Sequence, residues 1–323
     1  MNARVFVSRR LPGPALEQLA QQVDMQCWPE REPPSPVQLR DALRGCDGLL
    51  CTLTETIDDA LLAAAPQLRV VSSCSVGVDH VDVAALTRRC IPLGHTPHVL
   101  TDATADLAFA LLLATARRLP EGERFMRDGG WTPARRWEPD FLLGRDLRGA
   151  TLGLIGLGAI GQAVARRAAG FGMRIVGWTP SGRRVDGVES LSFAEVLQRA
   201  DFLSLHLALT AQTRHIVNAA ALARMRSEAV LINTARGGLV DETALIHALR
   251  SGRIAAAGLD VFEREPIGAD HPLLALPNVV VAPHIGSATL GTRSRMAQLA
   301  VDNLLAGLRG ERMPHCVNPE VQP

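Results

Sequence analysis

The stretch Thr151-Leu-Gly-Leu-Ile-Gly156-Leu-Gly158-Ala159-Ile160-Gly161-Gln-Ala-Val-Ala-Arg166 places a glycine-rich turn between an apolar run and a segment with helical spacing. Gly156 permits the tight turn, Gly158 lets the backbone approach a pyrophosphate, and Gly161 lets helix and strand pack closely. The helix amino terminus adds free N–H groups and partial positive charge, which favour phosphate. An ordinary glycine-rich turn is the simpler alternative. In this context we predict a dinucleotide site that includes Gly156, Gly158, Ala159, Ile160 and Gly161.

The size and composition of the chain predict a two-domain protein. Its 323 residues exceed the usual size of one domain, and 47% of them are hydrophobic, which can supply two cores. The net charge is +1, so neither a nucleic-acid partner nor a membrane surface is indicated. The apolar segment 107–116 is shorter than the roughly eighteen residues of a membrane span. The amino terminus reads as a short strand rather than a signal sequence, and we expect a cytoplasmic protein.

The cysteines predict neither a disulfide framework nor a metal site. They are scattered and form no Cys-x-x-Cys pair, which in a chain of this size favours reduced structural thiols. Zinc is not expected because the ligand spacing is absent. The six cysteines are Cys27, Cys46, Cys51, Cys74, Cys90 and Cys316.

Strand-like and helix-like segments alternate along the chain, which predicts parallel sheets covered by helices. A first series ends near residue 94, and a second begins at Thr151. The expected strands are residues 4–8, 48–53, 69–73, 91–94, 151–155, 174–177, 202–206, 229–233, 254–259 and 279–281. The expected helices between them include residues 14–22, 37–44, 81–89, 159–169, 193–199 and 242–250.

Two long helical segments, residues 101–119 and 287–308, flank the second series and would carry the chain into and out of it. We therefore predict an α/β fold with two doubly wound parallel-sheet domains. A Rossmann cofactor domain, residues 99–289, would be inserted into a discontinuous flavodoxin-like substrate domain, residues 1–98 and 290–323. A small substrate would be expected in a cleft between two such domains.

Three polar residues, Arg236, Glu265 and His284, follow predicted strands at the sheet edge where doubly wound folds hold ligands. An Arg guanidinium can grip a carboxylate through two charge-assisted hydrogen bonds. A His can deliver a proton near neutral pH, and a carboxylate beside it fixes its tautomer and favours the imidazolium. Each has a simpler alternative. Arg236 could cap a strand end, Glu265 could pair with Arg264, and His284 could be a structural core histidine.

Several motifs occur in a specific order over nearly the whole chain. They are Ser75-Val-Gly-Val-Asp-His80, Val99-Leu-Thr-Asp-Ala-Thr-Ala-Asp106, Gly130-Trp131, the glycine loop 156–161, Asn233-Thr-Ala-Arg-Gly237, Ala257-Gly-Leu-Asp260, Pro283-His-Ile-Gly-Ser-Ala288 and Asn303-Leu-Leu-Ala-Gly-Leu-Arg-Gly310. By these motifs the chain resembles the D-2-hydroxyacid dehydrogenase family, specifically its glyoxylate/hydroxypyruvate reductase branch.

The resemblance implies that Arg236, Glu265 and His284 are the catalytic residues. Glu263 is a rival for the role of Glu265, although the position just before Pro266 matches the family. The substrate contacts that the resemblance implies are Leu53, the backbone amides of Val76 and Gly77, Trp137, Arg236, His284 and Ser287. Trp137 resembles a residue that the branch inserts into the neighbouring subunit's site, and local packing is the alternative.

The loop after the second strand of the cofactor domain indicates whether NADPH or NADH is preferred. An NAD site usually carries an acidic residue about 20 residues after the glycine loop. Here that position is Thr179, which cannot repel a 2′-phosphate, while Ser181, Arg183 and Arg184 can bind one. Asp186 falls beyond the expected turn. We therefore expect NADPH rather than NADH, the alternative being solvated arginines and use of both cofactors.

The resemblance also implies the remaining cofactor contacts and the oligomeric state. Thr104 would contact the phosphates, and Asp260 the nicotinamide end. Ala159 stands where relatives often carry an Arg, which we expect to weaken cofactor affinity. A homodimer is implied, with residues 107–113 and 131–137 as candidate contacts. The full set of these further cofactor residues is Thr104, Thr234, Asp260 and Gly286.

The resemblance therefore implies an NADPH-preferring reductase of small 2-keto acids, with glyoxylate and hydroxypyruvate as the expected substrates. One alternative is another 2-keto acid, such as 2-ketogluconate or a phenylpyruvate-type substrate. Residues near Leu53, Trp137 and Arg293 would decide between them. A different class of function is a dinucleotide-sensing binding protein, of the kind that related transcriptional corepressors represent. The close match to the reductase branch argues against this second alternative.

Overall fold

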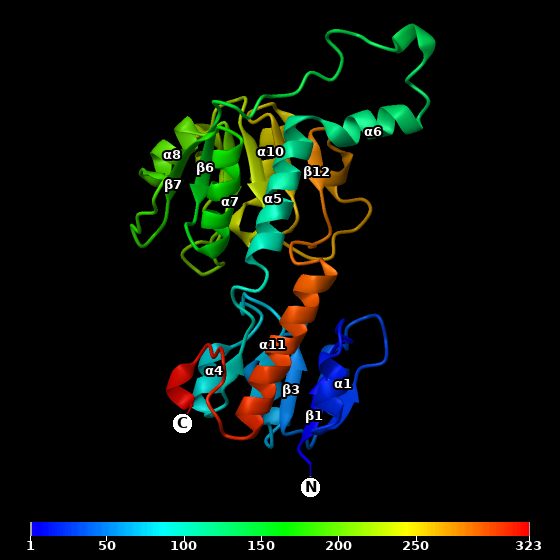
Figure 1. Ribbon diagram of the computed structural model, residues 1–323, viewed down its shortest axis with the longest axis vertical. Coiled ribbons are helices and arrows are strands. Elements are labelled where there is room, and N and C mark those ends of the chain that lie inside the picture. Colours follow the sequence, from blue (N-terminus) through cyan, green and yellow to red (C-terminus); the bar gives the residue numbers. More distant parts are fainter. Residues whose placement is uncertain (1, 323) are drawn as a thin grey trace. The chain divides into compact units, whose positions relative to one another are not determined.

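The computed structural model describes residues 2–322 and divides the chain into two compact units. The outer unit is Met1–Leu100 with Ser287–Pro323, and the inserted unit is Thr101–Gly286. Both termini belong to the outer unit (Figure 1). The chain passes between the units at Leu100 and Ser287 rather than at the expected residues 98 and 290. The physical reason is that the loop ending at Gly286 is hydrogen-bonded to other residues of the inserted unit.

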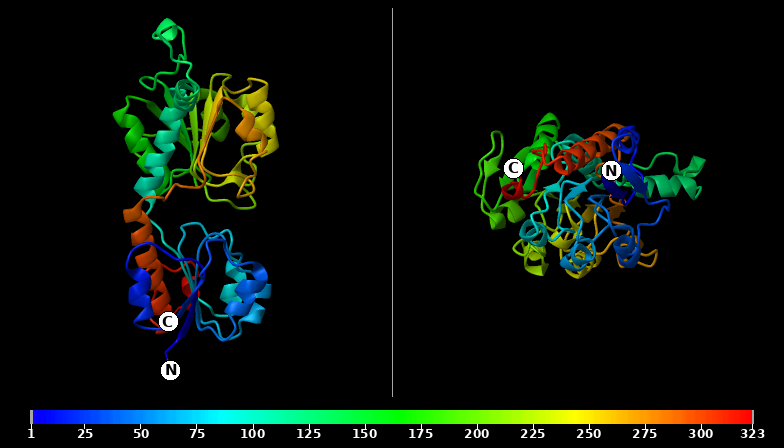
Figure 2. Two further views of the ribbon diagram at one scale, coloured as in Figure 1. Left: turned by 90° about the vertical axis from the view of Figure 1, so that its right-hand side faces the viewer. Right: turned by 90° about the horizontal axis from the view of Figure 1, so that it is seen from below.

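The outer unit contains a five-stranded parallel sheet in the order β2-β1-β3-β4-β5, the flavodoxin-like arrangement. Its strands are β1 (Arg4–Val7), β2 (Asp24–Cys27), β3 (Gly48–Cys51), β4 (Val70–Ser73) and β5 (Leu93–Gly94). Its helices are α1 (Ala15–Ala20), α2 (Pro36–Ala42), α3 (Asp59–Ala64), α4 (Val83–Arg88), α11 (Leu290–Leu308) and the short η4 (Pro319–Val321). Helices lie on both faces of the sheet (Figure 2).

Alternation along the outer strands fills two cores, because successive side chains of a strand point to opposite faces. Val5 and Val7 pack into the core beneath α1 and α11. Phe6, between them, packs into the core beneath α2, α3 and α4. Short strands whose side chains are buried on both faces thus suffice to build the centre of this sheet.

The inserted unit contains a seven-stranded parallel sheet in the order β12-β11-β10-β9-β6-β7-β8. Its strands are β6 (Thr151–Ile155), β7 (Arg174–Trp178), β8 (Glu189–Ser190), β9 (Phe202–Leu205), β10 (Val230–Asn233), β11 (Ala256–Leu259) and β12 (Val279–Val281). Its helices are α5 (Thr101–Ala116), α6 (Leu119–Arg127), α7 (Ala159–Gly170), α8 (Phe193–Arg199), α9 (Ala219–Arg224) and α10 (Glu242–Arg250), with short η1 (Pro133–Arg135), η2 (Gly237–Leu239) and η3 (Pro272–Ala275). The strand order reverses between β6 and β9, as in a Rossmann fold.

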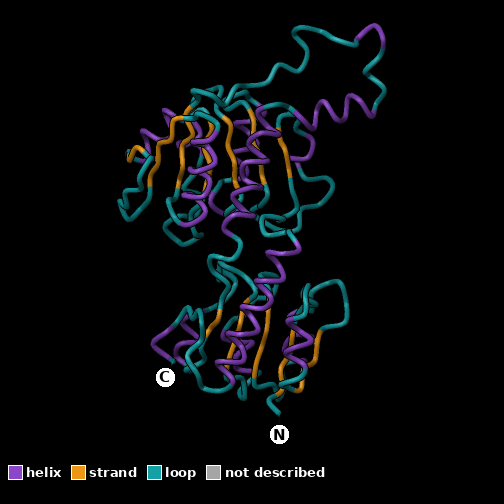
Figure 3. Tube along the Cα trace, viewed as in Figure 1, coloured by secondary structure: helices purple, strands orange, loops and turns teal. Residues whose placement is uncertain are grey.

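The predicted α/β fold class is confirmed, and most predicted elements occur within a few residues of their expected bounds (Figure 3). The strand β2 was missed because it is an edge strand without an apolar run, Asp24-Met-Gln-Cys27. The elements α3, α6, α9 and β8 were also missed. The two-residue strand β8 is exposed, so no buried face marks it in the sequence.

The predicted helix 101–119 ends earlier than expected, at Ala116. Arg118 then adopts a left-handed conformation, with φ of 51°, before α6 begins. The second predicted long helix begins at Leu290 rather than at Ser287, because the Thr289 side chain caps it by accepting from Thr292 N. Among residues 2–322, no helix combines the length and the apolar character that crossing a membrane would need.

Candidate active site

Three neighbouring strands of the inserted sheet end in polar loops. β10 leads to Arg236, β11 to Glu265, and β12 to His284. Because β10, β11 and β12 are parallel and adjacent, their carboxyl ends meet at one edge of the sheet. The inserted unit therefore gathers the three predicted catalytic residues at the sheet edge where doubly wound folds bind their ligands.

His284 and Glu265 form a close hydrogen-bonded pair. His284 Nδ1 lies 2.6 Å from Glu265 Oε2, and the two side chains are 27% and 29% exposed. The other carboxylate oxygen, Oε1, accepts from Phe262 N at 2.9 Å, which holds the carboxylate in place. A proton on Nδ1 directed at Glu265 leaves Nε2 of the ring as the nitrogen that can exchange a proton with a ligand.

The charge of Glu265 is maintained by its hydrogen bonds. Burial alone would raise the pKa of this carboxyl, but the bonds from His284 and Phe262 N outweigh it, and the charges of His284 and Arg236 add to them. The pKa of Glu265 is therefore lowered, and the carboxylate stays ionised at neutral pH. A negative charge at this position favours the protonated form of a histidine.

The alternative partner for His284, Glu263, is engaged elsewhere. Glu263 Oε1 lies 2.7 Å from His215 Nε2 and 3.3 Å from Arg214 Nη1. Glu265 in turn bonds His284 and Phe262 N, so it is not simply the partner of its neighbour Arg264 on the surface. The geometry thus distinguishes the two carboxylates that the sequence leaves as rivals.

Asp260 holds the loop that carries His284. Its side chain is fully buried, with Oδ1 accepting from Ile285 N at 2.7 Å and Oδ2 from Gly286 N at 2.8 Å. Its carbonyl accepts from His284 N at 2.9 Å. Burial raises the pKa of Asp260 although these amides oppose the shift. The contact of Asp260 with the nicotinamide end stays a prediction, and within the protein its carboxylate holds the amides of Ile285 and Gly286.

Arg236 is presented by a turn that the buried Asn233 organises. Asn233 Nδ2 donates to Arg236 O at 2.9 Å, and Ala235 N donates to Asn233 Oδ1 at 3.0 Å. The half-buried Arg236 side chain also donates from Nη1 to Ala235 O at 2.9 Å. A Cβ on the adjacent Gly237 would meet the Phe262 carbonyl, so glycine allows this turn to approach the loop of Glu265. Asn233 was not predicted as a functional residue; its position at the end of a buried strand is the signal that could have identified it.

The glycine loop has the geometry that its motif predicts. Gly156 has φ of 104°, and a Cβ there would lie 2.5 Å from His206 O. A Cβ on Gly161 would lie 2.2 Å from Gly156 O, whereas one on Gly158 would meet nothing within 4 Å. Gly158 is exposed at the start of α7, next to Ala159. The loop is therefore tightly packed on the protein side and open at the helix amino terminus, which fits a pyrophosphate.

Two threonines, Thr104 and Thr234, test whether the residues at this edge of the inserted sheet fit a dinucleotide. Thr234 Oγ1 is buried and has no hydrogen-bond partner within residues 2–322, so a polar ligand group there would satisfy it. Thr104 Oγ1 donates to Gly286 O at 3.2 Å and is almost fully buried. The residues present thus fit the cofactor, and Thr104 also supports the loop at Gly286. The contact of Thr104 with the phosphates stays a prediction.

The loop after β7 is exposed and carries no acidic residue at its start. Thr179 Oγ1 lies 3.5 Å from Ser181 Oγ, and Arg183 and Arg184 are both exposed. Over residues 2–322 neither arginine forms an ion pair within 4.0 Å. The charges of this loop are therefore not neutralised by the protein itself.

The predicted substrate residues of the outer unit lie in loops that follow its strands. Leu53 follows β3 and is 40% exposed. Val76 and Gly77 follow β4, are half-buried, and donate no backbone hydrogen bond within the described chain. Ser287 is half-buried and directly follows Gly286. Two consecutive uncommitted N–H groups are a common arrangement for binding an anion.

Trp137 lies on the segment that joins α6 to β6, which projects from the inserted unit (Figure 1). Its side chain is 81% exposed, and that of Trp131 is 57% exposed. Local packing of the segment involves Arg135, whose guanidinium lies 4.8 Å from the Phe125 ring centre and 5.1 Å from that of Phe141. The exposure of Trp137 therefore argues against the alternative that it is packed locally.

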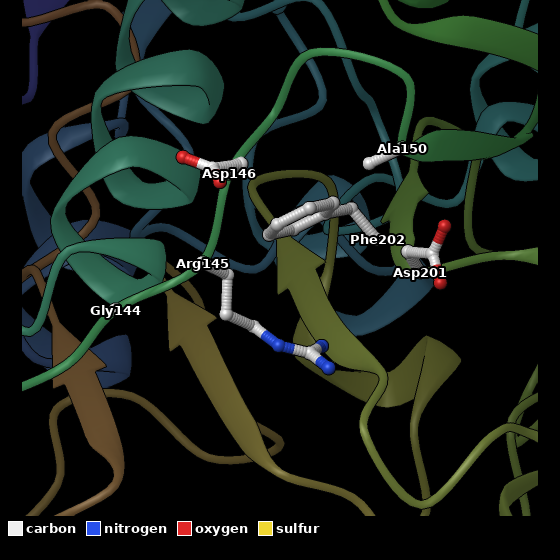
Figure 4. Close-up of a pocket in the computed structure, with 6 residues that line it drawn as sticks. All are labelled: Gly144, Arg145, Asp146, Ala150, Asp201 and Phe202. Carbon is white, nitrogen blue, oxygen red and sulfur yellow. The ribbon is translucent and has the colours of Figure 1, made fainter.

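A cavity of about 350 Å³ lies away from this edge (Figure 4). Ala150 precedes β6, and Asp201 and Phe202 begin or precede β9, so the cavity adjoins the amino ends of these strands. Arg145, which also lines it, pairs with Glu228 at 2.8 Å. This cavity is thus separate from the Arg236, Glu265 and His284 cluster.

Comparisons with known proteins show which family the chain resembles over its length. Residues 109–286 match the family described as D-isomer specific 2-hydroxyacid dehydrogenase, NAD binding domain. The glyoxylate reductase of Korarchaeum cryptofilum is 48% identical over 326 residues, which cover 99% of this chain and 97% of that protein. The TT0316 protein of Thermus thermophilus has a structure with a TM-score of 0.91 and 48% identity, covering 97% of this chain and 99% of that one. An NADPH-dependent glyoxylate/hydroxypyruvate reductase of Sinorhizobium meliloti, solved with NADP and malonate, gives a TM-score of 0.88 at 35% identity, covering 100% and 98%.

Proposed function

Since this chain belongs to the D-isomer specific 2-hydroxyacid dehydrogenase family, we propose that it reduces glyoxylate and hydroxypyruvate with NADPH as the preferred cofactor. It is an NAD(P)-dependent dehydrogenase that acts between 2-keto acids and 2-hydroxy acids. The observation that supports this proposal most directly is the His284–Glu265 pair. Its two atoms are 2.6 Å apart, and it lies on the same sheet edge as Arg236 and the glycine loop.

Substrate binding is assigned to groups that complement a carboxylate. The Arg236 guanidinium offers parallel N–H donors, and the Val76 and Gly77 amides add two further N–H groups. Leu53 and Ser287 are assigned to the part of the pocket that receives the rest of the acid, and Trp137 to the same part of the pocket of the other subunit in the homodimer proposed below. When bound, the reduced nicotinamide supplies the hydride for the keto carbon. Gly156 to Gly161 would hold its pyrophosphate, with Thr234 and Gly286 nearer the reacting end.

His284 is assigned as the proton donor to the keto oxygen. Protonated His284 gives its Nε2 proton to the oxygen as negative charge develops there, and the product is the neutral alcohol. Glu265 stabilises the imidazolium through Nδ1 and fixes the direction of the ring. Each turnover therefore consumes one proton through His284, which must be protonated again before the next.

Replacing Glu265 by Gln should lower kcat/KM for glyoxylate by about 10- to 100-fold. The Gln side chain can still accept a hydrogen bond from His284 Nδ1, but it lacks the negative charge that Glu265 places 2.6 Å from that nitrogen. A hydrogen bond to a charged partner is worth roughly 1.5–3 kcal/mol, more than one to a neutral amide. Steady-state kinetics of both proteins provide the measurement. Glu263→Gln serves as the control, and an unchanged kcat/KM for Glu265→Gln would remove Glu265 from the proton path.

NADPH preference is proposed from the loop after β7. Its first position, Thr179, brings no negative charge against a 2′-phosphate. Ser181 can donate to that phosphate, and Arg183 and Arg184 can neutralise it, since neither forms an ion pair among the described residues. NADH lacks the phosphate and gains nothing from these charges.

The double substitution Arg183→Ala and Arg184→Ala should weaken NADPH binding by about 10- to 100-fold, because both arginines are exposed and each contact with the phosphate contributes roughly 1 kcal/mol. NADH binding should change less than threefold. Fluorescence titration of each cofactor gives both dissociation constants. Arg250→Ala, an exposed arginine at the end of α10, is the matched control. An equal loss for both cofactors would contradict a phosphate pocket in this loop.

A homodimer is proposed from the projecting segment. Besides Trp131 and Trp137, Leu119, Met126 and Leu143 are more than half exposed there. Such a concentration of exposed apolar side chains on one segment is typical of an interface. Trp137 is proposed to reach the partner's substrate site. Sedimentation equilibrium measures the oligomeric state, and a monomer at micromolar concentration would exclude this role for Trp137.

The decisive assay is the initial rate of NADPH and NADH oxidation with glyoxylate, hydroxypyruvate, pyruvate and 2-ketogluconate. Faster NADPH-dependent turnover of the first two acids is the expected result. Preference for 2-ketogluconate would keep the mechanism and change the substrate. Binding of the dinucleotide without turnover of any acid would contradict an enzymatic role and favour dinucleotide sensing.

A further inference from the structure

Three consecutive carbonyl groups in the loop after β4 are held by hydrogen bonds. Thr96 N donates to Ser75 O at 2.8 Å, and Ser75 Oγ donates to Gly77 O at 2.8 Å. Between them, His95 Nδ1 lies 3.1 Å from Val76 O, and since a carbonyl oxygen only accepts, Nδ1 carries the proton. All three carbonyls are thus committed within the outer unit.

These bonds also set the directions of the neighbouring N–H groups. A peptide unit is planar and trans, so its N–H points opposite to its carbonyl. Holding Ser75 O therefore orients the N–H of Val76, and holding Val76 O orients that of Gly77. Neither N–H has a partner within residues 2–322, so both are available for an anion. The Val76 N–H is oriented by a backbone donor, Thr96 N, whereas the Gly77 N–H depends on the side chain of His95.

The backbone of His95 is itself firmly placed. The fully buried Asn303 of α11 donates from Nδ2 to His95 O at 2.9 Å and accepts from His315 N at 2.9 Å. A Cβ on the preceding Gly94 would lie 2.6 Å from the Cβ of Asn303, so β5 packs directly against α11 there. The imidazole ring is consequently presented to Val76 from a backbone that has little freedom to move.

The environment of His95 favours a neutral ring. Burial lowers the pKa of His95 most strongly; the bond to Val76 O opposes this, while His315 and His98 lower it further. The His95 and His315 ring centres are 6.4 Å apart. A neutral imidazole with its proton on Nδ1 makes the same bond as a side-chain amide would, without adding charge beside the amides.

We propose that His95 is a positioning residue that aims the Gly77 N–H at the carboxylate of the 2-keto acid. This inference rests on the proposed function, because it concerns the same substrate. His95 acts through the Val76–Gly77 peptide and does not touch the substrate. Loss of the hydrogen bond from His95 to Val76 O should weaken carboxylate binding equally in the ground state and in the transition state. This raises KM and leaves kcat almost unchanged.

The test compares His95→Leu with His95→Asn in the full-length protein. Leu removes the donor, whereas Asn places an amide nitrogen two bonds from Cβ, where His carries Nδ1. We expect His95→Leu to raise KM for glyoxylate about 5- to 10-fold, the effect of one hydrogen bond, with kcat within twofold of wild type. His95→Asn should restore most of the affinity. Binding of oxalate in the presence of NADP⁺, measured by calorimetry, should weaken by the same factor in His95→Leu and recover in His95→Asn.

His98→Leu is the matched control, since His98 belongs to the same histidine cluster, with a ring centre 6.2 Å from that of His315, and forms no hydrogen bond to Val76. An unchanged KM and oxalate affinity in His95→Leu would overturn the proposal. It would also be overturned if His95→Asn raised KM and weakened oxalate binding as much as His95→Leu. The same holds if kcat, NADPH affinity and melting temperature fell together in His95→Leu. If the wild type turns over no acid but binds oxalate, the proposed function fails while the oxalate comparison still decides the role of His95.

Discussion

His284→Ala should lower kcat for glyoxylate reduction by about 10²- to 10⁴-fold, the usual contribution of a positioned general acid. The alanine variant has no group at this position that can give a proton to the keto oxygen, so charge develops there without neutralisation. NADPH affinity should change less than twofold, because the loop around His284 is held by Asp260 through the backbone of residues 284–286. Single-turnover rates and NADPH titration measure the two effects separately.

The chain supplies a matched control for this variant. His215 also pairs with a glutamate, since its Nε2 lies 2.7 Å from Glu263 Oε1, but it is not part of the Glu265–His284 pair. His215→Ala should therefore keep kcat within about twofold of wild type. Normal turnover by His284→Ala, or an equal loss in both variants, would reject His284 as the proton donor.

Arg236→Ala should lower kcat/KM for glyoxylate by about 10²- to 10³-fold. Removing one partner of a buried, hydrogen-bonded charge pair costs roughly 2–5 kcal/mol, and the substrate carboxylate would be the charge left unpaired. Arg236→Lys keeps the charge but loses the two parallel donors, so we expect an intermediate loss. Steady-state kinetics with glyoxylate provide the measurement, and most of the loss should be in KM.

The control for Arg236 is Arg214→Ala, which removes an exposed arginine that pairs with Glu263 at 3.3 Å. This variant should retain wild-type KM. A KM for Arg236→Ala within threefold of wild type would show that the carboxylate is held by other groups. A large fall in melting temperature would instead indicate that Arg236 mainly supports the turn that Asn233 organises.

The elements that could be predicted from the sequence are those whose signals are local. The strand Thr151–Ile155 and the helices Phe193–Arg199 and Glu242–Arg250 have their predicted bounds. The first is a continuous apolar run, and the helix at Phe193 begins with a capping box between Ser192 and Glu195. The strand β2 has no such signal, because it is an exposed edge strand that forms only by pairing with β1.

The sequence also determined which residues follow the strands of the cofactor domain, because parallel strands of one sheet end at one edge. Arg236, Glu265 and His284 could therefore be proposed as a group. Sequence spacing could not separate Glu265 from Glu263, since both follow β11 within a few residues. Only the tertiary structure decided that Glu265 bonds His284 while Glu263 bonds His215.

The supporting contacts depended on tertiary structure throughout. Asp260 supports the amides of Ile285 and Gly286, 25 and 26 residues away in the chain. His95 reaches Val76 across 19 residues, and Asn303 reaches His95 across 208. The sequence alone thus determined the fold class and the chemistry of the predicted site, because those follow from local patterns and strand order. The tertiary structure decided which groups fix the directions of the reacting and binding atoms, because hydrogen bonds depend on distances of a few ångströms that sequence separation does not specify.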